Sequence, residues 1–212
     1  MKNSNALIFF EQMSKKISNN PQSVKLAANV DFTYIDASFI LEYANRKSSI
    51  LDIGTGTGLI INKIYKKVKY IECVEPYKNF TKFINKSSNI KIINKTIYDY
   101  DTDKSFDIVT MFGFMHYVGE YEAIKIYEKC FKFLKYAGKI IVKNQFGIKE
   151  DVNVAGYSEE QKTNYFAQYR HIDKEIKILN NAGFKNIQIF DIYPPEANRW
   201  HNTHFYAITA EK

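Results

Sequence analysis

Short apolar runs alternate with longer amphipathic stretches from residue 49 to residue 144. Each short run is rich in β-branched residues, which is typical of a buried strand. We expect five strands here, at Ile50–Ile53, Tyr70–Val74, Ile90–Asn94, Phe106–Met111 and Lys139–Asn144. The stretches between them that have helical spacing are Leu59–Lys67, Lys78–Lys86 and Glu120–Tyr136. Strands that alternate with helices predict a parallel sheet with helices on both faces.

The segment before this alternation is helical in pattern. Residues 4–18 and Tyr34–Ala44 place apolar side chains at helical spacing, so we expect a helical N-terminal cap over residues 1–46. The alternating core then covers residues 47–212. We expect one domain over the whole chain, residues 1–212, because a chain of this length supports one sizeable core.

The pattern changes again after the fifth predicted strand. Residues 145–170 are polar and aromatic without clear periodicity, and we expect an insertion there. A helix is predicted at Asp173–Ala182, ending before a glycine. Two further strands, Ile187–Ile192 and His204–Ala210, are joined by a short connection and should pair antiparallel. The expected sheet therefore has seven strands and is mostly parallel, with the last strand reversed.

Composition narrows the class of protein. No apolar run approaches the length of a membrane span, and the N-terminus lacks the features of a signal peptide. Cys73 and Cys130 are far apart and fit no metal-ligand spacing, so we expect no metal and two reduced thiols in a cytoplasmic protein. The net charge is +7, but the lysines are spread evenly and form no basic block. This distribution does not favour nucleic acid as a partner.

A glycine-rich turn, Asp52-Ile53-Gly54-Thr55-Gly56-Thr57-Gly58, follows the first predicted strand and opens a predicted helix. Glycines allow a tight turn and a close approach of the backbone to a ligand. An acidic residue at the start of the turn is unfavourable for a pyrophosphate and favourable for a cationic ligand. The motif resembles motif I of the class I S-adenosylmethionine-dependent methyltransferases.

This resemblance implies a Rossmann-like α/β fold, a three-layer sandwich, with S-adenosylmethionine as cofactor and S-adenosylhomocysteine as product. Asp52, Gly54, Thr55 and Gly56 would line the cofactor. Glu75 ends the second predicted strand, where the family has an acidic residue that accepts hydrogen bonds from both ribose hydroxyls. Pro76, beside it, would also lie against the cofactor.

The position of the adenine ring is less typical of the family. Family members often have a Gly-Asp pair about a dozen residues before a Phe-Asp pair, which is Phe106-Asp107 here. That spacing leads to Thr96 and Ile97, which we expect to line the adenine pocket. Asp99, three residues later, is the alternative.

The segment after the fourth predicted strand resembles motif IV of the family. Phe112 and Phe114 could line the cofactor or the acceptor, or could pack in the core. His116 lies where many members that act on small molecules carry a histidine, and it is our candidate general base. It could instead position an anionic acceptor, or be a packed histidine. The N-terminal segment often closes over the cofactor in related folds, and Tyr34 is our candidate there, together with Phe32.

Two short segments contain most of the unusual polar residues. One is Tyr169-Arg170-His171, and the other contains Arg199 and His201. Arginine suits phosphate-like anions, so we expect these five residues to bind a polar or anionic acceptor. An O-methyltransferase acting on a phosphorylated or nucleotide-linked sugar, such as a precursor of a surface polysaccharide, is the expected activity. The alternative is that these are surface loops.

Other functions remain open at this stage. The basic composition is compatible with an RNA or DNA methyltransferase, but no Asn-Pro-Pro-Tyr or Asp-Pro-Pro-Tyr motif follows the fourth predicted strand. A cofactor-binding homologue without catalytic activity would also keep Asp52 and Glu75. An NAD-dependent oxidoreductase is disfavoured by Asp52 and by the reversed last strand. The acceptor atom and the oligomeric state are not indicated by the sequence.

Overall fold

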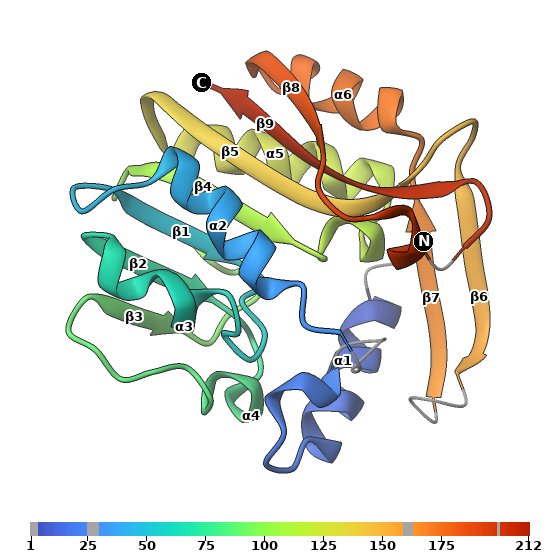
Figure 1. Cartoon of the computed structure of the whole chain (residues 1–212), viewed down its shortest axis with the longest axis horizontal. Helices are drawn as coiled ribbons and strands as arrows, with labels where there is room; N and C mark the ends of the chain where they lie inside the picture. Colours follow the sequence, from blue (N-terminus) through green and yellow to red (C-terminus); the bar gives the residue numbers. More distant parts are fainter. Residues whose placement is uncertain (1–3, 25–29, 159–162, 199) are drawn as a thin grey trace.

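A seven-stranded sheet forms the centre of the molecule and has helices on both faces (Figure 1). This computed structural model describes residues 4–24, 30–158, 163–198 and 200–212. In spatial order the strands are β3 (Ile90–Ile93), β2 (Tyr70–Val74), β1 (Ser49–Ile53), β4 (Phe106–Phe112), β5 (Leu134–Gly147), β9 (Thr203–Glu211) and β8 (Lys185–Asp191). Strand β9 pairs antiparallel with both of its neighbours, and the other pairings are parallel. The predicted fold class is confirmed.

The two faces of the sheet bury separate hydrophobic cores. Successive side chains of a strand point to opposite faces, so Leu51 and Ile50 of β1 enter different cores. Leu51 packs on the side of α5 (Glu120–Phe133) and α6 (Ile172–Asn181). Ile50 packs on the side of α2 (Thr33–Tyr43) and α3 (Ile61–Ile64). Burial on both faces explains why the strands are continuous apolar runs.

Two predicted helices are much shorter in the structure. The stretch Leu59–Lys67 forms only α3, followed by the 3-10 turn η2 (Tyr65–Lys67), and Lys78–Lys86 forms only α4 (Lys78–Thr81). The Asn62 side chain donates to the Phe83 carbonyl at 2.9 Å and accepts from the Asn85 N–H at 2.8 Å. These side-chain bonds replace helical bonds of the backbone, so tertiary contacts end α4 early.

The insertion expected at residues 145–170 has regular structure that the sequence pattern did not indicate. Strand β5 continues to Gly147, and β6 (Val152–Ser158) and β7 (Thr163–Tyr169) form a separate antiparallel hairpin. Tyr165, Ala167 and Tyr169 are buried along one face of β7. Figure 1 shows this hairpin standing beside the sheet, next to α1 (Ser4–Lys16).

The N-terminal segment is helical, as expected. It contains α1, the 3-10 turn η1 (Pro21–Val24) and α2. Helix α1 contacts α4 and β7, and α2 lies on the sheet. Two further 3-10 turns, η3 (Met115–Tyr117) and η4 (Pro195–Ala197), follow β4 and β8. Within the described ranges, no helix has both the length and the apolar character needed to cross a membrane.

Candidate active site

The glycine-rich turn connects β1 to α3 at the carboxyl edge of the sheet. Gly54, Gly56 and Gly58 all have positive φ angles, of 72°, 56° and 73°. A Cβ atom at Gly54 would lie 3.1 Å from the Phe114 ring, and one at Gly58 would lie 2.5 Å from Ile84 Cγ1. The turn therefore requires glycine for its backbone conformation and for its close packing.

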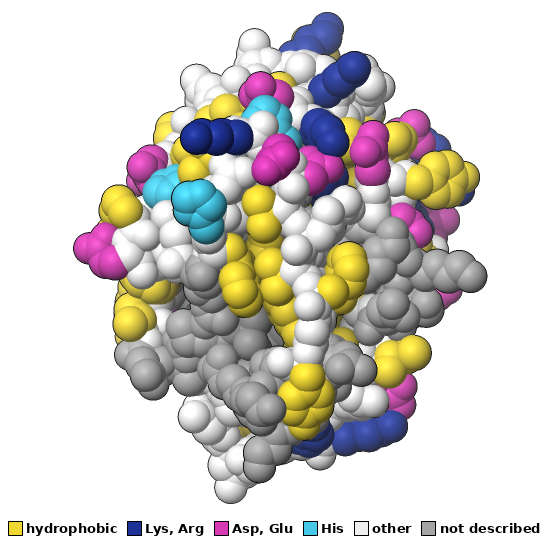
Figure 2. Space-filling model, turned by 90° about the vertical axis from the view of Figure 1, so that its right-hand side faces the viewer, with side chains coloured by type: hydrophobic (Ala, Val, Ile, Leu, Met, Phe, Trp, Pro, Cys, Tyr) yellow, Lys and Arg dark blue, Asp and Glu magenta, His cyan; other side chains and the backbone are white. Residues whose placement is uncertain are grey.

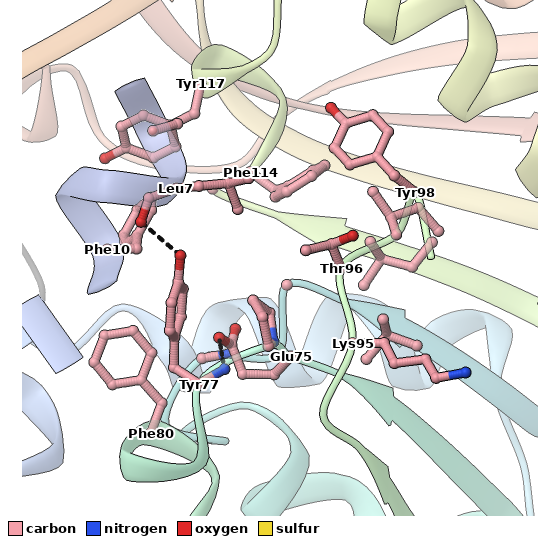
Figure 3. Close-up of a pocket in the computed structure, with 18 residues that line it drawn as sticks. Leu7, Phe10, Glu75, Tyr77, Phe80, Lys95, Thr96, Tyr98, Phe114 and Tyr117 are labelled. Carbon is pink, nitrogen blue, oxygen red and sulfur yellow. Dashed lines mark hydrogen bonds between the residues drawn. The ribbon is translucent and has the colours of Figure 1, made fainter. Parts of the chain in front are cut away.

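Gly54 and Gly56 lie on the walls of two cavities. The first cavity has a volume of about 140 Å³ and is shown in Figure 3. Its other wall residues are mostly apolar or aromatic, and include Leu7, Phe10, Phe80, Ile97, Phe114 and Tyr117. Lys95 also borders this cavity, but its ammonium group points away from the space between the labelled side chains (Figure 3).

Glu75 lies at the base of the first cavity, immediately after β2. Its Oε2 accepts from the Gly56 N–H at 3.0 Å, and its Oε1 accepts from the Tyr77 N–H at 3.1 Å. Burial raises the pKa of the Glu75 carboxyl to about 7, and the nearby Asp52 adds to this effect. The carboxylate is thus fixed in place by backbone donors, and its acceptor capacity is not exhausted by two hydrogen bonds.

Asp52 is buried below the turn rather than facing either cavity. Its Oδ1 accepts from the Thr110 hydroxyl at 2.6 Å, which links β1 to β4. Burial raises the pKa of the Asp52 carboxyl. The structure therefore gives Asp52 a positioning role below the turn, and does not place it in the direct ligand contact implied by its motif.

Thr96 borders the first cavity on the side opposite Phe80 (Figure 3). Ile97 lines the same cavity, and the contact of both residues with an adenine ring stays a prediction. Thr96 Oγ1 donates to Asp99 Oδ2 at 2.6 Å, and Asp99 itself does not line the cavity. Pro76 and Tyr98 complete this side. An apolar slot with a hydroxyl at its edge suits a flat purine ring.

The first cavity fits S-adenosylmethionine better than a dinucleotide. The Glu75 carboxylate occupies the Gly56 N–H, which is the type of backbone donor that a pyrophosphate would need. A second negative charge at this position would be repelled. Ribose hydroxyls, by contrast, can donate to the same carboxylate, and the apolar slot accepts the base.

The second cavity, of about 280 Å³, lies on the other side of the glycine turn. Thr55 and Phe112 border this cavity and not the first one. Further walls come from α2, η3, β5, β7 and β9, through Asp36, His116, Lys143, Gln145, Tyr169 and Phe205. The two cavities are neighbours, because they share the wall residues Phe10, Gly54, Gly56, Gly113 and Tyr117.

His116 is in η3 and borders the second cavity. Its Nδ1 lies 3.2 Å from Asn144 Oδ1, and its ring stacks on Tyr169 with centroids 5.4 Å apart. With the Asn144 oxygen facing the ring, Nδ1 donates this hydrogen bond and Nε2 keeps its lone pair. Burial, together with the charges of Lys143 and Arg170, lowers the pKa of His116 to about 4. The ring is therefore neutral near pH 7.

Asp36 and Lys143 border one end of the second cavity and form a buried triad with Tyr193. Lys143 Nζ lies 3.4 Å from Asp36 Oδ2 and donates to the Tyr193 hydroxyl at 2.9 Å. Tyr193 in turn donates to Asp36 Oδ1 at 2.6 Å. Burial beside Asp36 raises the pKa of the Tyr193 phenol, so it remains a donor. The three residues come from α2, β5 and the loop before η4.

Strand β7 of the hairpin contributes two tyrosines to the second cavity. Tyr165 and Tyr169 both border it, and their hydroxyl groups are 2.8 Å apart. The Trp200 indole N–H donates to the Tyr169 hydroxyl at 3.0 Å, which ties the hairpin to the loop before β9. Tyr169 thus lines the second cavity, and its predicted contact with an acceptor stays a prediction.

Arg170 is not at the acceptor side, contrary to the expectation from the sequence. Its Nε donates to Glu175 Oε2 at 2.6 Å, and its two terminal nitrogens donate to the carbonyls of Val118 and Met115. Glu175 also accepts from the Tyr127 hydroxyl. The guanidinium is buried in this network and fixes the loop that carries His116. Its role is therefore structural, and it does not line either cavity.

Three more expected site residues lie away from both cavities. His171 contacts the Ile148 carbonyl through Nε2 at 2.7 Å, and His201 is exposed in the turn before β9. Figure 2 shows histidine side chains on the outer surface of the molecule, among charged side chains. Tyr34 is 67% exposed and lies under Lys63, because it is on the outer face of α2. Arg199 lies outside the described residues.

The sequence reasoning missed Asp36, Lys143 and Tyr193. A lysine directly after the apolar run Ile140-Ile141-Val142, near the carboxyl end of a strand, was a usable signal for Lys143. Asp36 is a carboxylate on the apolar face of α2, which was a second signal. Tyr193 had none, because its contact with Asp36 spans 157 positions of the chain.

Comparisons with known proteins agree with this geometry. Residues 50–138 match a family model described as a methyltransferase domain. No curated protein sequence matches the chain. Many solved structures share the fold at low sequence identity.

Three of these structures illustrate the similarity. An N1-methyltransferase from Burkholderia thailandensis, solved with 1,6-didemethyltoxoflavin and S-adenosylhomocysteine, is 12% identical with a TM-score of 0.75, covering 99% of this chain and 88% of that one. An S-adenosylmethionine-dependent methyltransferase from Leishmania major is 15% identical with a TM-score of 0.72, covering 96% and 82%. Another from Methanosarcina mazei is 16% identical with a TM-score of 0.64, covering 82% and 96%. Residues 50–138 thus match a methyltransferase domain, and the solved structures share the Rossmann-like fold expected from the sequence.

Proposed function

We propose that this protein transfers a methyl group from S-adenosylmethionine in the first cavity to an oxygen of a small polar acceptor in the second. The observation that carries this proposal is that the two cavities are neighbours and share wall residues, among them Gly54 and Gly56. Glu75 would accept the ribose hydroxyls, while Thr96 and Ile97 would border the adenine. The buried free thiols Cys73 and Cys130 support a reducing, cytoplasmic setting.

The chain's own residues orient the acceptor and move its proton. When bound, S-adenosylmethionine supplies a methyl group on a positively charged sulfur, which needs no further activation. His116 Nε2 takes the hydroxyl proton as the acceptor oxygen bonds to the methyl carbon and the carbon–sulfur electron pair stays on sulfur. With a pKa of about 4, His116 is a weak base, so an acidic hydroxyl such as a phenol or enol suits it best.

The acceptor need not be anionic. The expectation of a phosphorylated or nucleotide-linked sugar depended on Arg170 and Arg199. Arg170 is committed to Glu175 and two carbonyls, and Arg199 lies outside the described residues. Among the described residues that line the second cavity, the cation Lys143 is paired with Asp36. We therefore propose a small molecule without a required negative charge.

Calorimetry with S-adenosylhomocysteine and with NAD tests the cofactor assignment. We expect binding of S-adenosylhomocysteine alone, and loss of that binding in Glu75→Ala. Once an acceptor is identified, His116→Gln should lower kcat by about 100-fold or more and leave the affinity for S-adenosylhomocysteine unchanged. Binding of NAD in preference to S-adenosylhomocysteine would contradict the proposal.

A further inference from the structure

We infer that the acceptor is an uncharged, planar heteroaromatic molecule whose edge carries a hydrogen-bond donor next to an acceptor. Its rings would lie between aromatic walls of the second cavity, with that edge against Asp36 and Lys143. This inference rests on the proposed function, because it concerns the acceptor side of the same site. The inference identifies the Asp36–Lys143 pair as the group that selects the acceptor.

The charge of the cavity end favours a neutral ligand. The side chains of Asp36 and Lys143 are 2% and 10% exposed, and their charges are 3.4 Å apart. The pair is neutral as a whole, so an added anion would meet the Asp36 carboxylate as well as the Lys143 ammonium. If Asp36 or Lys143 formed an ion pair with a charged ligand instead, its present partner would be left buried and unpaired. Such a buried, unpaired charge is strongly unfavourable.

The donors and acceptors of the pair are complementary to one kind of ligand edge. The ammonium has three donors, and one of them is used by the Tyr193 hydroxyl. The carboxylate accepts from Tyr193 on Oδ1 and faces Lys143 with Oδ2. A lactam or imide edge, with a carbonyl next to an N–H, can accept from Lys143 and donate to Asp36. Neither bond requires a charged ligand.

Aromatic rings surround this polar end. Phe112 on β4 and Phe205 on β9 border the cavity, and their ring centres lie 5.5 Å and 5.7 Å from Lys143 Nζ. Tyr165 and Tyr169 border it from the hairpin. Flat aromatic walls stack well on a planar ring. His116 borders the same space, where a weakly acidic ring hydroxyl or enol would be positioned for proton removal.

Calorimetry on the full chain saturated with S-adenosylhomocysteine tests the inference. The probe is quinazoline-2,4-dione, which has an imide edge, and its matched analogue is 1,3-dimethylquinazoline-2,4-dione, which lacks both N–H groups. Glucose 1-phosphate serves as the anionic probe. We expect quinazoline-2,4-dione to bind about tenfold or more tightly than either the dimethyl analogue or glucose 1-phosphate. Neither of these two compounds offers a carbonyl next to an N–H, so each would leave buried polar groups of the pair unpaired.

Variants then assign the effect to the pair. Lys143→Met can leave Asp36 buried and unpaired, so the double variant Asp36→Leu/Lys143→Met, which removes both charges, is the main test. We expect it to fold, to keep its affinity for S-adenosylhomocysteine within about twofold, and to lose the preference for the imide edge. Lys135→Met is the matched control, because Lys135 also pairs with an aspartate, Asp107 at 2.8 Å, away from both cavities.

The outcomes separate this inference from the proposed function. Equal or tighter binding of glucose 1-phosphate, or an unchanged imide preference in the double variant, overturns the acceptor assignment alone. The acceptor assignment is also overturned if the double variant loses as much affinity for S-adenosylhomocysteine as for the imide probe. Asp36 and Lys143 would then hold the amino-acid end of the cofactor. A wild-type chain that does not bind S-adenosylhomocysteine contradicts the proposed function itself.

Discussion

Glu75 illustrates how a single side chain can be both structural and functional. Its carboxylate closes the glycine turn through Gly56 and caps the start of the next segment through Tyr77. It is also the acidic group on the wall of the first cavity. Burial makes ionisation of this carboxyl costly. Near neutral pH, the ligand-free protein therefore contains both the neutral and the ionised form of Glu75.

The cofactor affinity should therefore depend on pH. The pKa of Glu75 is about 7, so only about a tenth of the ligand-free protein has this carboxylate ionised at about pH 6. Because ribose hydroxyls donate to the ionised form, we expect the Kd of S-adenosylhomocysteine to rise about tenfold from about pH 8 to about pH 6. Calorimetry at several pH values measures this change.

The control for this experiment is Glu75→Gln, which has a similar shape but does not ionise in this range. Its affinity should be weaker than that of the wild type and nearly constant with pH. A wild-type Kd that does not change between the same two pH values would show that Glu75 stays ionised or does not contact the cofactor.

At the scale of elements, the Arg170–Glu175 pair joins β7, α6 and the loop around η3. Arg170→Met leaves Glu175 buried without its cation, and we expect a loss of about 3–5 kcal/mol in the free energy of unfolding. Urea denaturation measures it. Lys135→Met, at an exposed pair, should cost less than about 1 kcal/mol. Wild-type stability in Arg170→Met, with an altered acceptor KM, would restore the binding role first expected for this residue.

The elements also show what a sequence can and cannot predict. The strand runs predicted β1, β2 and β4 closely, because burial on both faces leaves a continuous apolar signal. The glycine turn, Glu75, Thr96 and Ile97 line the first cavity, and their spacing from local motifs was enough to single them out, while their contacts with a cofactor stay a prediction. The hairpin was missed, since its buried face depends on α1 and other distant segments. The same holds for Arg170, whose partners were decided by folding and not by its neighbours in sequence.

At the scale of the whole molecule, the N-terminal helix completes the cofactor side. Ala6, Leu7 and Phe10 of α1 border the first cavity, and the Tyr77 hydroxyl donates to the Leu7 carbonyl at 2.6 Å. We expect S-adenosylhomocysteine to slow amide hydrogen exchange in α1, because the ligand adds contacts that hold the helix in place. Mass spectrometry of peptides covering Ser4–Lys16 measures this, with α6 as the internal reference. Equal protection of α1 and α6 would contradict the expectation.

The family model matches residues 50–138, which include the glycine turn, Phe112 and His116 of the second cavity but not its walls from α2, β7 and β9. Gly54, Glu75 and Thr96 lie inside the matched segment, whereas the triad lies entirely outside it. The residues that carry the sequence match and the residues of the triad therefore lie on different segments of the chain. On the proposed function, exchanging α2, the end of β5 and the hairpin would change the acceptor and leave the first cavity intact, so these segments are the place to graft a new selectivity.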